Sequence, residues 1–109
     1  MSRRYFAGVD GGGTKTVVAL ADEEGRELVR RQGAAGLVDP RDPTAAAETV
    51  IALVQDAARE AGLAGPAAVL CAGLAGVGNP AEREAVREAL AAARIACRVR
   101  VATDGEIAL

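Results

Sequence analysis

The chain has 109 residues, half of them hydrophobic, and carries a formal net charge of −2 at pH 7. This length predicts a single domain with a hydrophobic core and is too short for two domains. The charged residues are dispersed and no apolar run approaches the roughly 20 residues of a membrane span, which argues against nucleic-acid binding and against a membrane segment. The N-terminus also lacks the apolar stretch of a signal peptide, so we expect a cytoplasmic protein.

The chain contains no histidine and two cysteines, Cys71 and Cys97, that lie far apart in the sequence. This composition argues against zinc and iron–sulfur sites and against catalysis by Cys-His or Ser-His-Asp arrangements. We therefore expect both cysteines to be small core residues.

Three apolar segments follow one another in the first third of the chain, separated by turns that contain glycine. The second segment, TVVALA at 16–21, is β-branched and apolar, and all three have strand length, so they predict an antiparallel three-strand meander. The expected strands cover residues 4–9, 14–22 and 26–32.

The first of these turns carries the most specific motif of the chain, GVDGGGTKT at residues 8–16. Glycines accept backbone angles that other residues avoid, so their N–H groups can converge on an anion. Thr14, Thr16 and Lys15, the only lysine of the chain, add hydroxyl and cationic donors. The motif therefore predicts a phosphate-binding turn, with Asp10 helping to hold a magnesium ion.

Two other kinds of glycine-rich turn are less consistent with this motif. A Walker A loop fails by one residue, because Thr14 stands between Gly13 and Lys15, and it would have to open a helix rather than a strand. An ordinary hairpin would not require three glycines, which cost conformational entropy on folding. The sequence therefore favours a phosphate-binding turn between two strands.

The middle of the chain predicts a helix followed by a buried strand. Asp42 caps the helix, Pro43 occupies its first turn, and the apolar spacing continues to about Ala61. Residues 67–72 form a continuous apolar run, which is typical of a central strand covered by helices on both faces.

The last third of the chain predicts a second helix and a final strand. Asn79-Pro80 begins the helix, whose charged residues form a solvated surface. Residues 95–103 alternate apolar residues with Arg98 and Arg100, which indicates a strand with one buried face. The resulting order is β-β-β-α-β-α-β, a mixed α/β sheet with an antiparallel meander followed by parallel strands. This is the order of the ribonuclease H-like fold that actin-like ATPases and kinases use.

Three segments carry a family resemblance: GVDGGGTKT at 8–16, CAGLAGVGNPAERE at 71–84 and VATDGEIAL at 101–109. With them the whole chain resembles the N-terminal domain of the BadF/BadG/BcrA/BcrD-type ATPase family. That family includes N-acetylglucosamine kinases and lies within the hexokinase, Hsp70 and actin superfamily. The first segment alone also resembles the ROK sugar kinases, whereas the second favours the BadF-like group.

The resemblance implies an ATP-dependent phosphotransferase that uses Mg²⁺ and phosphorylates a sugar, in particular an amino sugar. It implies that Asp10 acts near the magnesium ion and that Asp104 is the general base beside the acceptor. A helix cap is the alternative role for Asp104. The residues implied to bind the ATP phosphates are Gly11, Gly12, Gly13, Thr14, Lys15 and Thr16.

The resemblance also bears on domain organisation. Residues 1–109 would be the N-terminal actin-like ATPase domain, ending in or just before its last helix, with the second domain absent. We expect the isolated chain not to turn over substrate. It should also self-associate, with a homodimer as one form, because side chains of the domain interface would be uncovered.

The sequence leaves the acceptor and several alternative functions open. Family members that act on N-acetylglucosamine commonly carry an asparagine after the third strand, where this chain reads GAAGLVD at 33–39. Within the family, an ATPase that activates a CoA-ester reductase or dehydratase is an alternative, and outside it a non-catalytic domain that binds a sugar or nucleotide. A nuclease of the same fold would use Asp10 and another carboxylate for two metals. The triple glycine and the lack of a basic surface argue against the nuclease.

Overall fold

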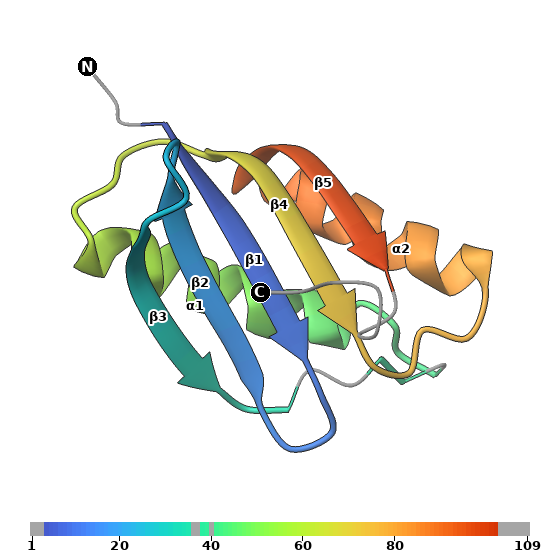
Figure 1. The fold of residues 1–109 in the computed structure, drawn as a ribbon. Helices are drawn as coiled ribbons and strands as arrows, with labels where there is room; N and C mark the ends of the chain where they lie inside the picture. The colour runs from blue at the N-terminus through green and yellow to red at the C-terminus, as the bar shows by residue number, and fades with distance from the viewer. Residues whose placement is uncertain (1–3, 36–37, 40, 103–109) are drawn as a thin grey trace.

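The computed structural model describes residues 4–35, 38–39 and 41–102. These residues form a five-stranded mixed sheet with strand order β3-β2-β1-β4-β5, and two helices (Figure 1). Strands β1, β2 and β3 pair antiparallel, whereas β4 pairs parallel with β1 and β5. The elements are β1 (Tyr5–Gly11), β2 (Thr16–Asp22), β3 (Glu27–Gly33), α1 (Ala45–Glu60), β4 (Ala67–Leu74), α2 (Pro80–Ala92) and β5 (Ala96–Ala102). The predicted fold class, a ribonuclease H-like (actin-like ATPase) domain, and its element order are confirmed.

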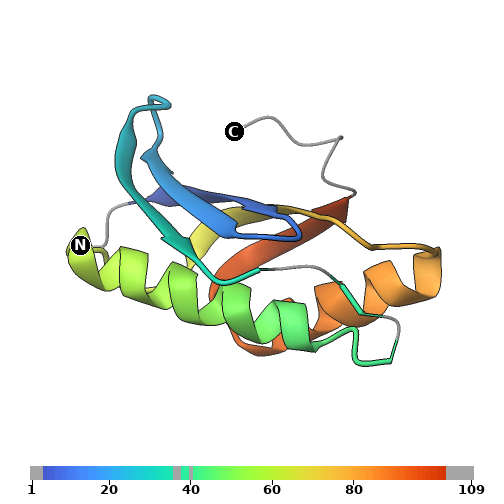
Figure 2. The ribbon, with the colours of Figure 1, turned by 90° about the horizontal axis from the view of Figure 1, so that it is seen from below.

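Both helices lie on the same face of the sheet, which we call the helix face (Figure 2). Alternate side chains of the strands point to this face and form the core with one apolar stripe of each helix. The other face, the open face, carries no helix among the described residues. The largest fully buried apolar side chains of the core are Tyr5, Val9, Val18, Leu20, Val38, Val50, Val54, Leu70, Leu74, Val86 and Leu90.

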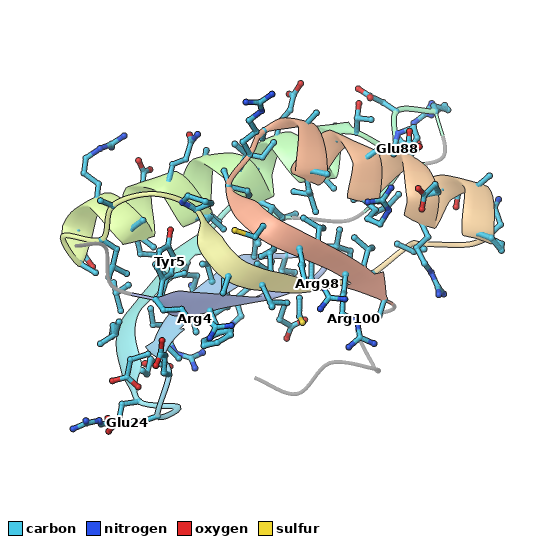
Figure 3. All side chains as sticks on the ribbon, turned by 90° about the horizontal axis from the view of Figure 1, so that it is seen from above. Arg4, Tyr5, Glu24, Glu88, Arg98 and Arg100 are labelled. Carbon is cyan, nitrogen blue, oxygen red and sulfur yellow. The ribbon has the colours of Figure 1, made fainter. Side chains whose placement is uncertain are left out.

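The prediction that helices cover both faces of the fourth strand is wrong for the described part of the chain. Val69 and Cys71 point to the open face and are only half-buried, whereas Leu70 and Ala72 on the helix face are fully buried. The apolar run of β4 instead reflects its position between β1 and β5 in the middle of the sheet. Figure 3 shows Arg98 and Arg100 projecting from β5 on the side away from the helices, so this edge of the open face is basic.

Two smaller expectations also need correction. Helix α1 begins after Thr44 rather than at Asp42, because the Asp42 N–H instead donates to the Asp39 carbonyl at 2.9 Å. The cysteines are not core residues, since Cys71 is half-buried and Cys97 is exposed.

By contrast, Asn79 caps α2 as predicted and accepts the Glu82 N–H at 2.8 Å. None of the helices in the described residues is long and apolar enough to cross a membrane.

Candidate functional site

Four strands end at one edge of the sheet, which we call the carboxyl edge. Strands β1, β3, β4 and β5 run in the same direction and finish at Gly11, Gly33, Leu74 and Ala102 (Figure 1). Backbone hydrogen bonds join the segments that follow them: the Ala75 N–H donates to the Gly11 carbonyl, and the Val38 N–H donates to the Ala75 carbonyl, both at 2.8 Å. In open α/β sheets, ligands bind outside the carboxyl ends of the parallel strands. The carboxyl edge is therefore the first place to examine for a site.

The glycine motif forms the turn between β1 and β2 at this edge. Gly11 pairs with Thr16 at the end of the ladder, so the turn proper, the glycine loop, consists of residues 12–15. One hydrogen bond closes it, from the Gly12 N–H to the Lys15 carbonyl at 2.9 Å. This bond explains why Thr14 and Lys15 lie in the turn, whereas the sequence predicted a strand from residue 14.

A hollow of about 210 Å³ lies beside the glycine loop. It is lined by Asp10, Gly12, Thr14, Lys15 and Val17. Four of the predicted site residues therefore share one concave surface that offers a carboxylate, a hydroxyl, an ammonium group and backbone amides. Val17 is the member that sequence reasoning missed, although its alternation with Thr16 and Val18 along β2 predicts that it faces away from the core.

Asp10 occupies the open face at the carboxyl end of β1. Its neighbours across the sheet are Val17 on β2 and Gly73 on β4, and its side chain is exposed. Because Gly73 has no side chain, nothing on β4 covers the carboxylate at this level. An exposed carboxylate beside free amides and a lysine suits a cation that arrives with a phosphate group.

The glycines of the loop do not adopt a backbone conformation that requires glycine. Positive φ angles in the described glycines occur at Gly25, Gly62, Gly65 and Gly76, not at residues 11–13. A Cβ atom built on Gly13 would meet no atom within 4 Å, and one on Gly12 would meet only the Lys15 carbonyl oxygen at an ordinary 3.7 Å. The expectation that these glycines adopt angles closed to other residues is therefore corrected. What they contribute here is bare backbone that a ligand can approach.

Thr16 is the predicted phosphate-binding residue that the structure does not bring to the hollow. Its side chain points to the helix face, is fully buried, and has no hydrogen-bond partner for Oγ1 among the described residues. Two other predicted residues do not line the hollow: Gly11, which precedes the loop, and Gly13, which lies within it. Asp104 lies outside the described residues; β5, which precedes it, ends at Ala102 next to Gly73.

The described residues contain no preformed metal cage. Nowhere in residues 4–35, 38–39 and 41–102 do three or more Asp, Glu, Cys or His side chains come together as a metal cage. Mg²⁺ is commonly held by one or two carboxylates together with substrate phosphates and water. Asp10 beside the glycine loop fits that mode of binding and does not fit a permanent metal centre.

The fold is that of an actin-like ATPase domain, and the comparisons with known structures find it in sugar kinases. The chain is similar to a proposed N-acetylglucosamine kinase from Chromobacterium violaceum, with 32% identity and a TM-score of 0.76 over 96% of this chain and 36% of that one. A second proposed N-acetylglucosamine kinase, from Porphyromonas gingivalis, is 23% identical with a TM-score of 0.66 over 93% of this chain and 34% of that one. The chain thus spans about a third of the length of these two proteins.

A third solved structure shows the same fold over part of another kinase. Gluconate kinase from Lactobacillus acidophilus is 22% identical with a TM-score of 0.53, over 67% of this chain and 16% of that one. At this identity, as for the Porphyromonas gingivalis protein, the likeness shows the fold alone. No protein-family model matches the sequence, and no curated protein sequence matches it significantly.

Proposed function

We propose that this chain is the phosphate-binding N-terminal domain of an ATP-dependent sugar kinase of the BadF/BadG/BcrA/BcrD type. The complete enzyme would transfer the γ-phosphate of ATP to a hydroxyl group of an amino sugar, with N-acetylglucosamine as the first candidate. The observation that carries this proposal is the hollow at the carboxyl edge, which groups Asp10, Gly12, Thr14 and Lys15. The 32% identity to the Chromobacterium violaceum protein supports it.

The chemistry of phosphoryl transfer matches what the hollow offers. Such transfer needs mainly positioning and neutralisation of phosphate charge, and little covalent chemistry from the protein. In our proposal the amides of Gly13 and Thr14, which have no partner among the described residues, donate to phosphate oxygens. Lys15 adds a positive charge, and Asp10 holds the Mg²⁺ ion that accompanies ATP and neutralises its phosphates.

Two further parts of the proposal concern regions beyond the described residues. Asp104 would accept the proton of the sugar hydroxyl as general base, a contribution typically worth about 10²–10⁴ in rate. A second domain of the same polypeptide would complete the nucleotide site and the cleft.

The proposal is tested with the complete polypeptide that contains this chain, supplied with Mg-ATP and a panel of sugars. We expect phosphorylation of an amino sugar that Asp104→Asn lowers at least 100-fold. Glu106→Gln, two residues further on, is the matched control and should leave activity unchanged. ATP hydrolysis without a phosphorylated sugar, insensitive to Asp104→Asn, would instead indicate the activator ATPase. Sugar binding without any turnover would indicate a regulatory domain.

A further inference from the structure

The two helices end with the same backbone turn but with different residues. Helix α1 is followed by Ala61 and then Gly62, whose φ is 70°, and α2 is followed by Ala93 and then Arg94, whose φ is 55°. This left-handed position after a helix normally holds glycine, because a Cβ atom is strained there. Arg94 is the only non-glycine residue with positive φ in the described part of the chain. An arginine at a position that glycine would fill without strain suggests a role for its side chain.

Arg94 lines a hollow of about 370 Å³ at the edge of the sheet opposite the glycine loop. The hollow lies between the last turns of α1, the end of α2 and the segments that lead into β4 and β5. Its apolar wall includes Val54, Leu63 and Ile95, which are 2%, 9% and 6% exposed. The buried Tyr5 at the start of β1 borders it and donates its hydroxyl to the Gly65 carbonyl at 2.8 Å.

The polar lining of this hollow is cationic. Arg59 and Arg94 line it together with Gln55, and no carboxylate does. Arg59 forms an ion pair with Asp56 at 3.0 Å on the neighbouring surface, whereas Arg94 has no ion-pair partner in the described residues. The volume of the hollow lies within the range of small-molecule sites, which combine an apolar wall with a few polar groups.

We propose that this hollow binds a small organic anion, in which an apolar ring or chain packs on Val54, Leu63 and Ile95 and a carboxylate or phosphate group pairs with Arg94. The site is separate from the glycine loop, because the hollow is bordered by the starts of the parallel strands and the loop by their ends. It therefore suits an effector rather than a substrate of the proposed kinase. The Arg94 side chain has no ion-pair partner in the described residues, so its guanidinium is available to pair with an added anion, and strained backbone of the kind at Arg94 is often found at functional sites.

A purely structural explanation makes a different prediction. Cations near a helix C-terminus stabilise the helix dipole, and the last turn of α2 has no basic residue. If Arg94 served only this purpose, Arg94→Gly would lower stability and no ligand would depend on it. If Arg94 pairs with a ligand, ligand binding is lost in Arg94→Gly whatever the change in the melting temperature.

The test is a titration of the ¹⁵N-labelled chain with 1-naphthoate, followed by NMR, with 1-naphthalenemethanol as the uncharged analogue. We expect saturable shifts of the Gly65, Arg94 and Ile95 amides with naphthoate, and at least tenfold weaker binding of the alcohol. Arg94→Gly and Arg94→Gln should each weaken naphthoate binding at least tenfold. Arg83→Gln, which removes a charge from the same helix outside the hollow, should not.

Three results would overturn this proposal. The first is a naphthoate affinity that is unchanged in both Arg94 variants. The second is a set of shifts located on the open face or the glycine loop instead of around Gly65 and Ile95. The third is the absence of saturation with naphthoate.

Discussion

The two turns of the β1–β2–β3 meander are adjacent in sequence and both contain glycine, yet they are built differently. In the β2–β3 turn, residues 23–26, the Asp22 carboxylate accepts the Glu24 and Arg26 N–H groups, each at 2.9 Å. Gly25 has a φ of 83°, and its N–H donates to the Asp22 carbonyl at 3.0 Å. Glu24 lies at the tip of this turn, far from the helices (Figure 3). The turn satisfies its own polar groups and needs glycine for its backbone.

The glycine loop of residues 12–15 neither satisfies its own polar groups nor needs glycine for its backbone conformation. It has one internal hydrogen bond, and its glycines lie outside the left-handed region. Within the described residues, neither the Thr14 hydroxyl nor the Lys15 ammonium group has a partner. Glycine therefore serves two different purposes: it allows a left-handed conformation in one turn and leaves the backbone accessible in the other. Four experiments test this distinction and are given in decreasing order of the change that we expect.

The largest difference should come from the cation that each turn carries. If the complete protein is the proposed kinase, Lys15→Gln should lower its kcat/KM about 100-fold, because in our proposal Lys15 supplies a charged donor to the phosphates. Arg26→Gln should leave kcat/KM unchanged, since Arg26 pairs with Asp22 and Glu24 within its own turn. Steady-state kinetics with Mg-ATP measures both. Equal losses in the two variants would refute the distinction between the turns.

The carboxylate that organises the β2–β3 turn should matter for stability alone. Asp22→Ala leaves the Glu24 and Arg26 amides without their acceptor and should lower the free energy of unfolding by about 2 kcal/mol. Urea denaturation measures this change, and Glu23→Ala, at the neighbouring exposed carboxylate, is the control. Mg-ATP affinity should stay unchanged. A weaker affinity for Mg-ATP would show that the two turns are coupled.

Alanine at the two kinds of glycine should separate stability from binding. Gly25→Ala places a Cβ at positive φ and should cost about 1 kcal/mol of stability. Gly13→Ala meets open space, so stability should be unchanged or slightly higher, while the methyl group at the loop weakens Mg-ATP binding. Urea denaturation and titration calorimetry measure the two effects. A Gly13→Ala variant that binds Mg-ATP normally would contradict our account of the loop.

The smallest effect concerns Thr16, just after the loop. Thr16→Val replaces a buried hydroxyl without a partner by an apolar group of the same shape, and should raise stability by up to about 1 kcal/mol. Mg-ATP binding should not change, because the side chain faces the helices. Thr16→Ser keeps the hydroxyl and serves as the control. A loss of Mg-ATP affinity in the valine variant but not in the serine variant would show that the Thr16 hydroxyl belongs to the phosphate site.

The elements of the fold were largely predictable from local sequence. The strand order along the chain followed from apolar runs between turns, and Asn79 before Pro80 marked the start of α2 correctly. Predictions failed where a single backbone hydrogen bond within a turn decided the boundary, as at Thr14 and Lys15, which the Gly12–Lys15 hydrogen bond places in the turn. Cys97 was expected in the core from the alternation of β5, but its position near the start of an edge strand leaves it exposed.

The succession of strands and helices and the chemical groups of the glycine motif could be predicted from the sequence, because periodicity and residue type are local properties. Which motif residues share a surface depends instead on how the strands pair and pack. The pleat of β2 sends Thr16 to the core and Val17 to the hollow, and the parallel pairing of β1 with β4 sets Gly73 beside Asp10. The tertiary structure also decided that Arg94 and Arg59 meet at one hollow, since residues 35 positions apart approach only when the helices pack on one face.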